Sequence, residues 1–164
     1  MASRLALRHP YPFSAERVRE VLTDQRYVRA KLAAVGGPRA ELVSWEQSTG
    51  GVTLVLTQAI PEDSMPSFLR AMLPSGLTIR RTETWNGAGG RVHAVVDGAP
   101  GEITGVMRFA PDPAGCVIDA ELTAEVQVPL VGAKVEKIVT SNVAALMEKE
   151  YRFTLAWMEN PVHP

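Results

Sequence analysis

The sequence predicts an α+β fold in which a curved antiparallel sheet of six to seven strands wraps around one long C-terminal helix, the arrangement called a helix grip. Several segments that alternate apolar and polar residues follow one another through connections too short for parallel pairing. The last segment, residues 130–159, keeps its apolar residues close to one helical face and would span about 43 Å. No other segment is long enough to cover the apolar face of such a sheet.

The N-terminal part predicts one strand and two short helices. Residues 3–11 alternate as a half-buried strand does. Ser14 and Asp24 each precede a helical pattern, and their side-chain oxygens can accept from the free N–H groups of the first turn. A Gly-Gly-Pro run at residues 36–38 ends the second helix. The inner face of the strand would carry Leu5, Leu7, His9 and Tyr11.

The middle of the chain predicts a hairpin and a short helical insertion. Residues 39–48 and 51–60 pair around the turn Thr49-Gly50-Gly51. Residues 66–73 follow as a short amphipathic helix that begins near a proline. One face of the second hairpin strand carries Val52, Leu54, Leu56, Gln58 and Ile60. The apolar side of the insertion carries Phe68, Leu69, Met72 and Leu73.

Further strands are predicted at residues 77–85, 91–97, 102–110 and 116–128. In the first of them the more apolar face, which we expect to point inward, carries Leu77, Ile79, Arg81, Glu83 and Trp85. The long helix would bury Val131, Val135, Ile138, Val139, Asn142, Leu146, Phe153 and Trp157. Its solvated face would carry Lys134, Lys137 and Arg152, balanced by Glu136, Glu148 and Glu150.

Composition narrows the class of protein. The 164 residues are 46% apolar and 21% charged with a net charge of −1, which excludes a disordered chain and argues against a nucleic-acid binder. We expect one domain over residues 1–160 with a tail at 161–164. No stretch approaches the ~20 apolar residues that cross a bilayer. A single cysteine, Cys116, cannot form an internal disulfide, so a cytoplasmic location is expected.

Few residues suggest catalysis or metal binding. The three histidines are isolated in sequence and there is no cysteine pair, so we expect no metal and no cofactor. The glycines at 87–90 read as a turn, and Cys116 has no basic neighbour that would activate it, so we expect it to be buried. The weak candidates for an acid or base are His9, Glu83 and Tyr11.

Ligand binding is the more informative prediction, because polar residues interrupt apolar faces. Arg81 and Glu83 could orient a ligand carboxylate or hydroxyl group, or could form a self-satisfied ion pair at the sheet rim. Residues 61–74 could act as a lid or touch a membrane transiently, or could pack permanently on the sheet. The predicted ligand-binding residues are Leu54, Leu56, Gln58, Phe68, Met72, Ile79, Arg81, Glu83, Trp85, Met107, Asn142 and Leu146.

The order of elements resembles the START-like superfamily of pollen-allergen-type proteins, lipid-transfer domains and aromatase/cyclases. The segment YPFSAERVREVLTD (11–24) is similar to the opening of that superfamily. The chain also resembles a narrower, mainly actinobacterial family, domain of unknown function 2505, through IPEDSMPSFLRAML (60–73), TETW (82–85) and VPLVGAKVEKIV (128–139). This resemblance implies a helix-grip fold with an internal apolar cavity. It implies no particular reaction.

Three functions therefore stay open from the sequence. The leading one is binding or transport of a hydrophobic or amphipathic small molecule, a lipid or a polyketide-like compound, between the sheet and the long helix. The second is an aromatase/cyclase-like enzyme acting on a polyketide-type substrate. The third is a protein-interaction module with a filled core. The ligand and the oligomeric state do not follow from the sequence.

Overall fold

The computed structural model describes residues 2–37, 39–60, 62–72, 77–97 and 100–160. The predicted tail at 161–164 and part of the predicted lid at 61–74 lie outside them. The elements in chain order are β1 (Ala2–Tyr11), α1 (Ala15–Leu22), α2 (Gln25–Val35), β2 (Glu41–Ser48), β3 (Gly51–Ile60), the 3₁₀ helix η1 (Glu62–Ser64), α3 (Ser67–Met72), β4 (Leu77–Trp85), β5 (Gly89–Asp97), β6 (Gly101–Asp112), β7 (Gly115–Val126) and α4 (Gly132–Glu159).

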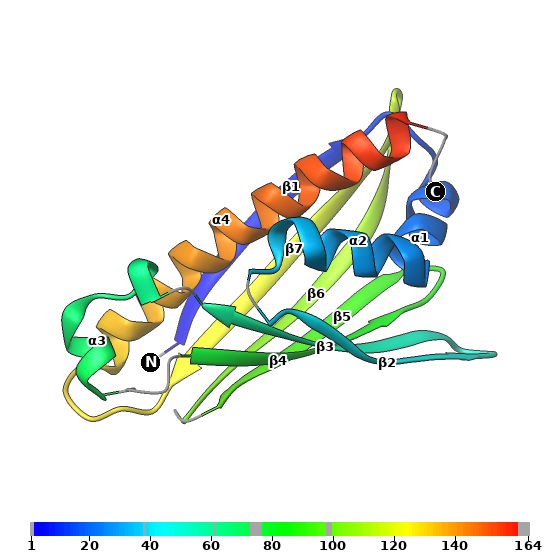
Figure 1. The fold of residues 1–164 in the computed structure, drawn as a ribbon. Helices are drawn as coiled ribbons and strands as arrows, with labels where there is room; N and C mark the ends of the chain where they lie inside the picture. Colours follow the sequence, from blue (N-terminus) through cyan, green and yellow to red (C-terminus); the bar gives the residue numbers. More distant parts are fainter. Residues whose placement is uncertain (1, 38, 61, 73–76, 98–99, 161–164) are drawn as a thin grey trace.

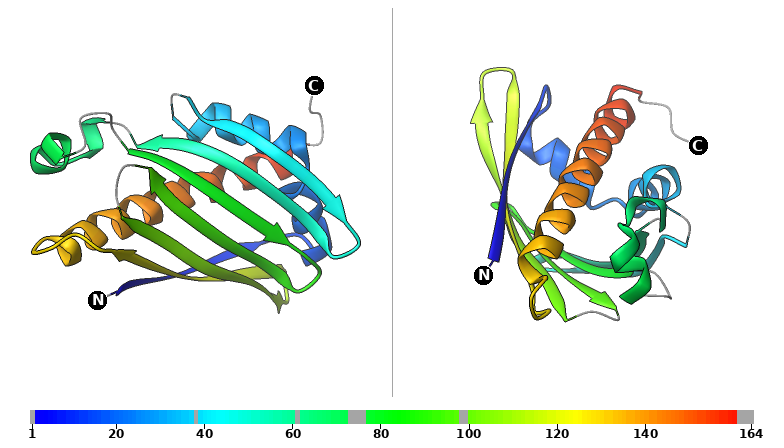
Figure 2. Two further views of the ribbon diagram at one scale, coloured as in Figure 1. Left: turned by 90° about the horizontal axis from the view of Figure 1, so that it is seen from below. Right: turned by 90° about the vertical axis from the view of Figure 1, so that its left-hand side faces the viewer.

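In the described part of the chain, seven strands form one sheet in the order β1-β7-β6-β5-β4-β3-β2. All neighbouring pairs are antiparallel, and β1 joins the sheet beside β7. The sheet curves around α4, as Figures 1 and 2 show, and α1 and α2 lie against one end of the concave side. The predicted helix-grip fold is confirmed.

The two predicted helix caps are present. The Ser14 hydroxyl accepts a hydrogen bond from the Arg17 backbone N–H at 3.2 Å, and the Asp24 carboxylate accepts from the Arg26 N–H at 2.8 Å. The indole of Trp45 on β2 donates to the Thr23 carbonyl between the two helices at 2.8 Å. These contacts hold α1 and α2 where they close one end of the sheet.

The predicted inward faces of the strands are confirmed by burial. On β3 the side chains at positions 52, 54, 56 and 58 are buried, whereas those between them are only half-buried. On β4 the buried positions are 77, 79, 81 and 85. Cys116 is buried at the start of β7, as expected. Together with residues from α2 and α4 these side chains form the core between the concave sheet and the long helix.

The prediction that all acidic residues of α4 lie on a solvated face is wrong. Glu136 is 2% exposed, and its carboxylate accepts a hydrogen bond from the Val126 N–H at the end of β7 at 2.8 Å. Glu150 is also enclosed, facing β4. Because α4 lies inside a curved sheet, a wider part of its circumference is covered than on a flat sheet (Figure 2).

The insertion helix α3 lies beside the start of α4. Phe68 is half-buried against the core, and the Lys134 ammonium group lies 4.7 Å from the centre of its ring, a cation–π contact. Lys134 therefore packs on α3 as well as facing solvent. Movement of this segment as a lid stays a prediction.

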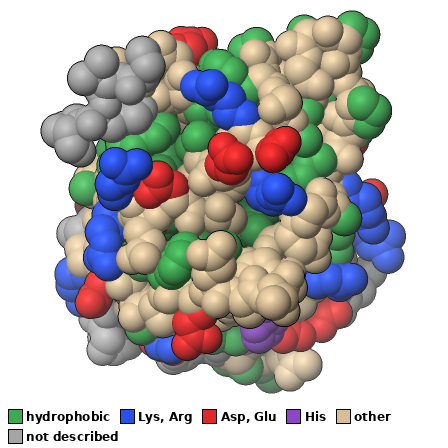
Figure 3. Space-filling model, turned by 90° about the vertical axis from the view of Figure 1, so that its right-hand side faces the viewer, with side chains coloured by type: hydrophobic (Ala, Val, Ile, Leu, Met, Phe, Trp, Pro, Cys, Tyr) green, Lys and Arg blue, Asp and Glu red, His purple; other side chains and the backbone are tan. Residues whose placement is uncertain are grey.

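The described surface shows no sign of membrane insertion through a helix. No described helix is both long and apolar enough to span a bilayer. On the face seen in Figure 3, acidic, basic and hydrophobic side chains are interspersed, and the basic ones do not gather into one continuous patch in that view.

Candidate functional site

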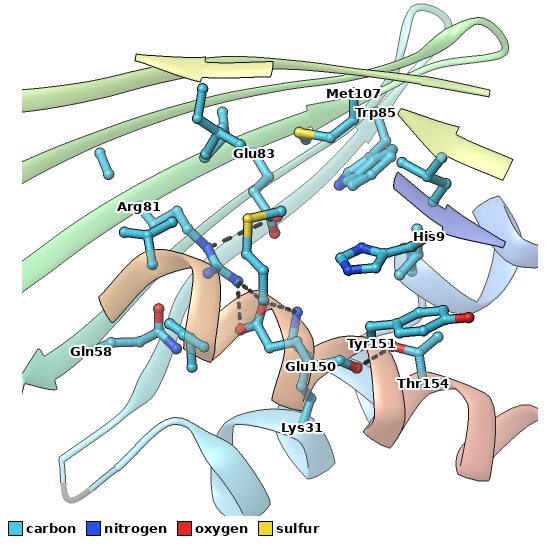
Figure 4. A pocket seen from close by; sticks show the side chains of 18 of the residues that line it. His9, Lys31, Gln58, Arg81, Glu83, Trp85, Met107, Glu150, Tyr151 and Thr154 are labelled. Atoms are coloured by element: carbon cyan, nitrogen blue, oxygen red, sulfur yellow. Dashed lines mark hydrogen bonds and ion pairs between the residues drawn. The ribbon is translucent and has the colours of Figure 1, made fainter. Parts of the chain in front are cut away.

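A pocket lies between the concave face of the sheet and α4 (Figure 4). Its volume open to water-sized atoms is about 120 Å³. At about 30 Å³ for each water molecule, that is room for roughly four of them. Its walls are mainly apolar, and the apolar side chains that line it are Leu22, Ile79, Val92, Ala94, Ile103, Met107, Ile118, Leu122, Val143, Leu146 and Met147.

A cluster of four charged side chains stands in this apolar pocket. Arg81 on β4 lies 3.2 Å from one carboxylate oxygen of Glu150 on α4 and 3.4 Å from the other. Its Nε lies 3.9 Å from Glu83 on the same strand. The Lys31 ammonium on α2 lies 4.0 Å from Glu150. The cluster therefore joins sheet, α2 and α4, and its formal charges cancel.

The pairing keeps the central pair ionised. Burial alone would raise the pKa of Glu150, but the charges of Arg81 and Lys31 outweigh it, so the pKa of this carboxyl lies below its usual range. Burial alone would lower the pKa of Arg81, but Glu150 and Glu83 raise it above its ordinary value. Both groups are thus charged at neutral pH although they are almost fully enclosed.

A hydrogen-bond chain runs from α2 to the backbone of α4 beside this cluster. The Thr154 hydroxyl donates to the Glu150 carbonyl at 2.7 Å and also lies 2.5 Å from the Tyr27 hydroxyl. Since the only hydroxyl proton of Thr154 is used on the carbonyl, the Tyr27 hydroxyl is the donor to Thr154. Burial strongly raises the pKa of Tyr27, so the hydroxyl stays protonated.

His9 and Tyr11 line the pocket from β1. The imidazole of His9 stacks on the ring of Tyr151 with 4.4 Å between centroids, and its Nε2 lies 3.5 Å from a carboxylate oxygen of Glu148. Burial lowers the pKa of His9, and Glu148 offsets only part of that effect. The lowered pKa keeps the His9 imidazole neutral at pH 7. The Tyr151 hydroxyl donates to the Pro10 carbonyl, and this hydrogen bond links α4 to β1.

Three buried N–H groups of the lining make no hydrogen bond within the described residues. They are Nε2 of Gln58, Nε of Arg81 and Nε1 of Trp85. These residues are 4%, 9% and 6% exposed. Buried donors without partners are uncommon in folded proteins, because each one loses its hydrogen bonds to water. A molecule in the pocket can supply the missing acceptors.

A glycine on the neighbouring strand makes room for the Trp85 ring. Trp85 is paired with Gly90 on β5, and a Cβ atom at Gly90 would lie 2.8 Å from the indole atom Cε3. The ring also packs against Phe109 with 6.1 Å between centroids. The indole thus lies flat over β5, with its nitrogen toward the space between β4 and α4 (Figure 4).

The structure brings most of the predicted ligand-binding residues together. The predicted residues that line the pocket, weak catalytic candidates included, are His9, Tyr11, Gln58, Ile79, Arg81, Glu83, Trp85, Met107 and Leu146. Their role in binding stays a prediction.

The other predicted residues lie elsewhere. Leu54 and Leu56 are fully buried in the core and are not among the lining residues. Phe68 packs under Lys134 on α3, outside the pocket. Asn142 lines an adjoining pocket and donates its amide to the Ile138 carbonyl at 3.0 Å. The side chain of Met72 lies outside the described residues. A strand face extends beyond any one pocket, which is why shared parity alone does not select lining residues.

Sequence reasoning missed Glu150, Lys31 and the Tyr27–Thr154 hydrogen bond. One signal was available for Glu150, because it follows Leu146 by four residues and so shares its helical face. Lys31 likewise follows Tyr27 by four residues on α2. A charged residue on an otherwise buried helical face is a candidate for an internal ion pair. Which strand residue it meets depends on how the helix lies on the sheet.

This fold and pocket define the class of protein. A curved seven-stranded antiparallel sheet gripping a long C-terminal helix, with a pocket between them, is the architecture of START-like, pollen-allergen-type proteins. Within that class the chain belongs to the family described as "Protein of unknown function (DUF2505)", whose model matches residues 6–158. The resemblance inferred from the sequence is confirmed.

Known proteins resemble the chain in sequence or in fold. The uncharacterized protein Rv0481c of Mycobacterium tuberculosis is 26% identical over 165 residues, covering 93% of this chain and 94% of the relative. The fold is similar to norcoclaurine synthase of Thalictrum flavum in complex with dopamine and hydroxybenzaldehyde, with a TM-score of 0.67, 13% identity, and coverage of 99% of this chain and 90% of that one. It is also similar to the di-domain ARO/CYC StfQ from the steffimycin biosynthetic pathway, with a TM-score of 0.65, 15% identity, and coverage of 97% and 52%.

Proposed function

We propose that this protein binds a hydrophobic or amphipathic small molecule, lipid-like or polyketide-like, in the pocket between the sheet and α4. One observation carries the proposal: a mainly apolar pocket contains three buried N–H donors that have no partner among the described residues. Apolar walls favour a ligand by about 25 cal/mol per Å² of buried surface, before ordering costs. The donors would orient its polar atoms.

Other observations support this function without deciding it. Norcoclaurine synthase, which shares the fold, is described in complex with two small aromatic molecules, and StfQ comes from a biosynthetic pathway. At such low identity the likeness carries the fold alone, so the proposal rests on the chemistry of this pocket. The proposal includes a cytoplasmic location, in keeping with the buried thiol of Cys116. Transient contact with a membrane during loading, through α3, belongs to the same proposal.

The test is native mass spectrometry of the purified protein, followed by solvent extraction and identification of any released molecule. We expect a stoichiometric apolar compound. Ala94→Met narrows the pocket from β5 and should reduce occupancy, whereas Ala114→Met on the exposed β6–β7 turn is the matched control. Circular dichroism checks that both variants fold. A clean apo mass, with no stabilisation by a panel of lipids and aromatic compounds, would indicate an interaction module with a filled core.

A second candidate function is catalysis of the aromatase/cyclase kind, and one observation favours it. The imidazole of His9 lines the pocket and is held neutral, which suits a general base. If the pocket is catalytic, the unmodified protein should release the product and His9→Gln the unconverted substrate, with equal occupancy. The two extracts are compared by mass spectrometry and NMR, because a cyclisation can conserve mass. The same compound from both proteins would support binding without catalysis.

A further inference from the structure

The partnerless side-chain atoms buried in the described residues are all hydrogen-bond donors. They are the N–H groups of Gln58, Arg81 and Trp85, and all three residues line the pocket. Two of them lie near carboxylates: Gln58 is close enough to Glu150 to help lower its pKa without completing a hydrogen bond, and Arg81 Nε is 3.9 Å from Glu83. Trp85 Nε1 is therefore the donor that most clearly lacks an acceptor.

The Trp85 indole can only donate, so its partner must be an acceptor. Tryptophan N–H groups usually find a partner when they are buried. In Figure 4 the indole nitrogen points into the space between β4 and α4, on the side where Arg81, Glu83 and Glu150 lie. Trp85 stands four residues beyond Arg81 on the strand, which is about 13 Å along β4. Glu83 lies between them on the same face, so a ligand oxygen bound to Trp85 Nε1 would lie beside Glu83 and at a distance from the Arg81–Glu150 pair.

The charges of the pocket restrict the ligand further. Lys31 and Arg81 balance Glu83 and Glu150, so the cluster is neutral before any ligand arrives. An added carboxylate or ammonium group would lie among apolar walls with no free counter-charge, so its loss of hydration would not be compensated. An uncharged polar group costs far less, and it gains the hydrogen bond that Trp85 offers.

We propose that the ligand is an uncharged, largely apolar molecule whose carbonyl-type oxygen accepts a hydrogen bond from Trp85 Nε1. The proposal rests on the binding function proposed above and names the chemical class of the ligand. The pocket volume of about 120 Å³ suits a buried portion of about one six-membered ring or a chain of similar size.

The test uses four probes that share one skeleton and differ only in their polar group: tetralin, 1-tetralone, 1-aminotetralin and tetralin-1-carboxylic acid. Their dissociation constants are measured by isothermal titration calorimetry on the full chain after extraction of any co-purified ligand. We expect 1-tetralone to bind about five-fold tighter than tetralin, as one neutral hydrogen bond implies. The acid and the amine should bind more weakly than the ketone.

Two tryptophan variants test whether the preference for 1-tetralone over tetralin comes from Trp85. Trp85→Phe keeps an aromatic ring and removes the donor, so tetralone and tetralin should bind it equally. Trp45→Phe is the matched control, because Trp45 already donates to the Thr23 carbonyl and does not line the pocket. It should retain the five-fold preference. Thermal unfolding by circular dichroism verifies that both variants fold.

The possible outcomes distinguish a failure of this inference from a failure of the proposed binding function. If tetralin binds as tightly as tetralone, or if the acid or the amine binds tightest, the inference is wrong and the binding function stands. If no probe binds and no ligand co-purifies, both are wrong. A ketone preference that survives in Trp85→Phe also overturns the inference. The ranking of the four probes on the unmodified protein decides the matter even if Trp85→Phe does not fold.

Discussion

The guanidinium of Arg81 on β4 lies 3.2 Å from the carboxylate of Glu150 on α4, and both side chains are nearly enclosed between the sheet and the helix. This pair connects two elements that lie far apart in the chain. Removal of one partner of a buried pair strands the other charge in an apolar environment. The pair therefore sets how α4 lies on the sheet as well as the polarity of the pocket.

Arg81→Met should destabilise the protein by about 3 kcal/mol, because Glu150 keeps only the longer contact to Lys31. Urea unfolding followed by circular dichroism measures the change. The double variant Arg81→Met/Glu150→Leu should recover a large part of the loss, because no buried carboxylate is left uncompensated. A double variant that is less stable than Arg81→Met alone would contradict the coupling.

Thr154→Val should cost more stability than Tyr27→Phe. Valine leaves the buried Tyr27 hydroxyl without its acceptor, which costs about 1–3 kcal/mol, whereas phenylalanine removes the donor and leaves Thr154 bonded to the Glu150 carbonyl, which costs about 1 kcal/mol. Equilibrium unfolding of both variants measures the order. The reverse order would mean that the Tyr27 hydroxyl has another acceptor.

Stability should fall as the pH drops below about 6.5, because of His9. Burial lowers the pKa of this imidazole in the folded state despite Glu148, so the unfolded chain binds more protons in that window. The stability that neutral His9 contributes is complete above about pH 6.5, the pKa of histidine in the unfolded chain. It is lost as the pH falls through the lower pKa of the folded state. Glu150, whose pKa is also lowered, adds a loss only below about pH 4.5.

The measurement is the melting temperature at pH 7.5 and pH 5.5. His9→Gln should flatten the difference between the two values. His93→Gln is the control, because the His93 side chain is half exposed on the outer side of the sheet and does not line the pocket. An unchanged pH dependence in His9→Gln would show that another group is responsible.

Gly90→Ala should displace the Trp85 indole. The added Cβ would lie 2.8 Å from the ring, so the ring must shift or β5 must move. We expect a destabilisation of about 1–3 kcal/mol, as overpacking costs, and a red shift of the tryptophan emission if the ring moves toward solvent. Gly50→Ala in the open β2–β3 turn is the matched control. No change in emission or stability would mean that the two strands part without strain.

Much of the fold could be predicted because its signals are local. Alternation on β4 and β3 showed which side chains face inward, and the oxygens of Ser14 and Asp24 marked two helix starts. Strand ends were less exact: β5 begins at Gly89, inside the stretch predicted as a turn. There the backbone of a glycine-rich turn already pairs with the next strand, which composition does not reveal.

The sequence by itself determined the order of elements, the inward faces of the strands and the polar residues that interrupt those faces, because periodicity is a property of neighbours in the chain. Only the tertiary structure decided the partners. Arg81 and Glu150 are 69 residues apart, and they meet because the curved sheet closes around α4. The same enclosure buried Glu136 and left Trp85 Nε1 facing a pocket without an acceptor. Such contacts depend on how whole elements pack, so no local pattern could contain them.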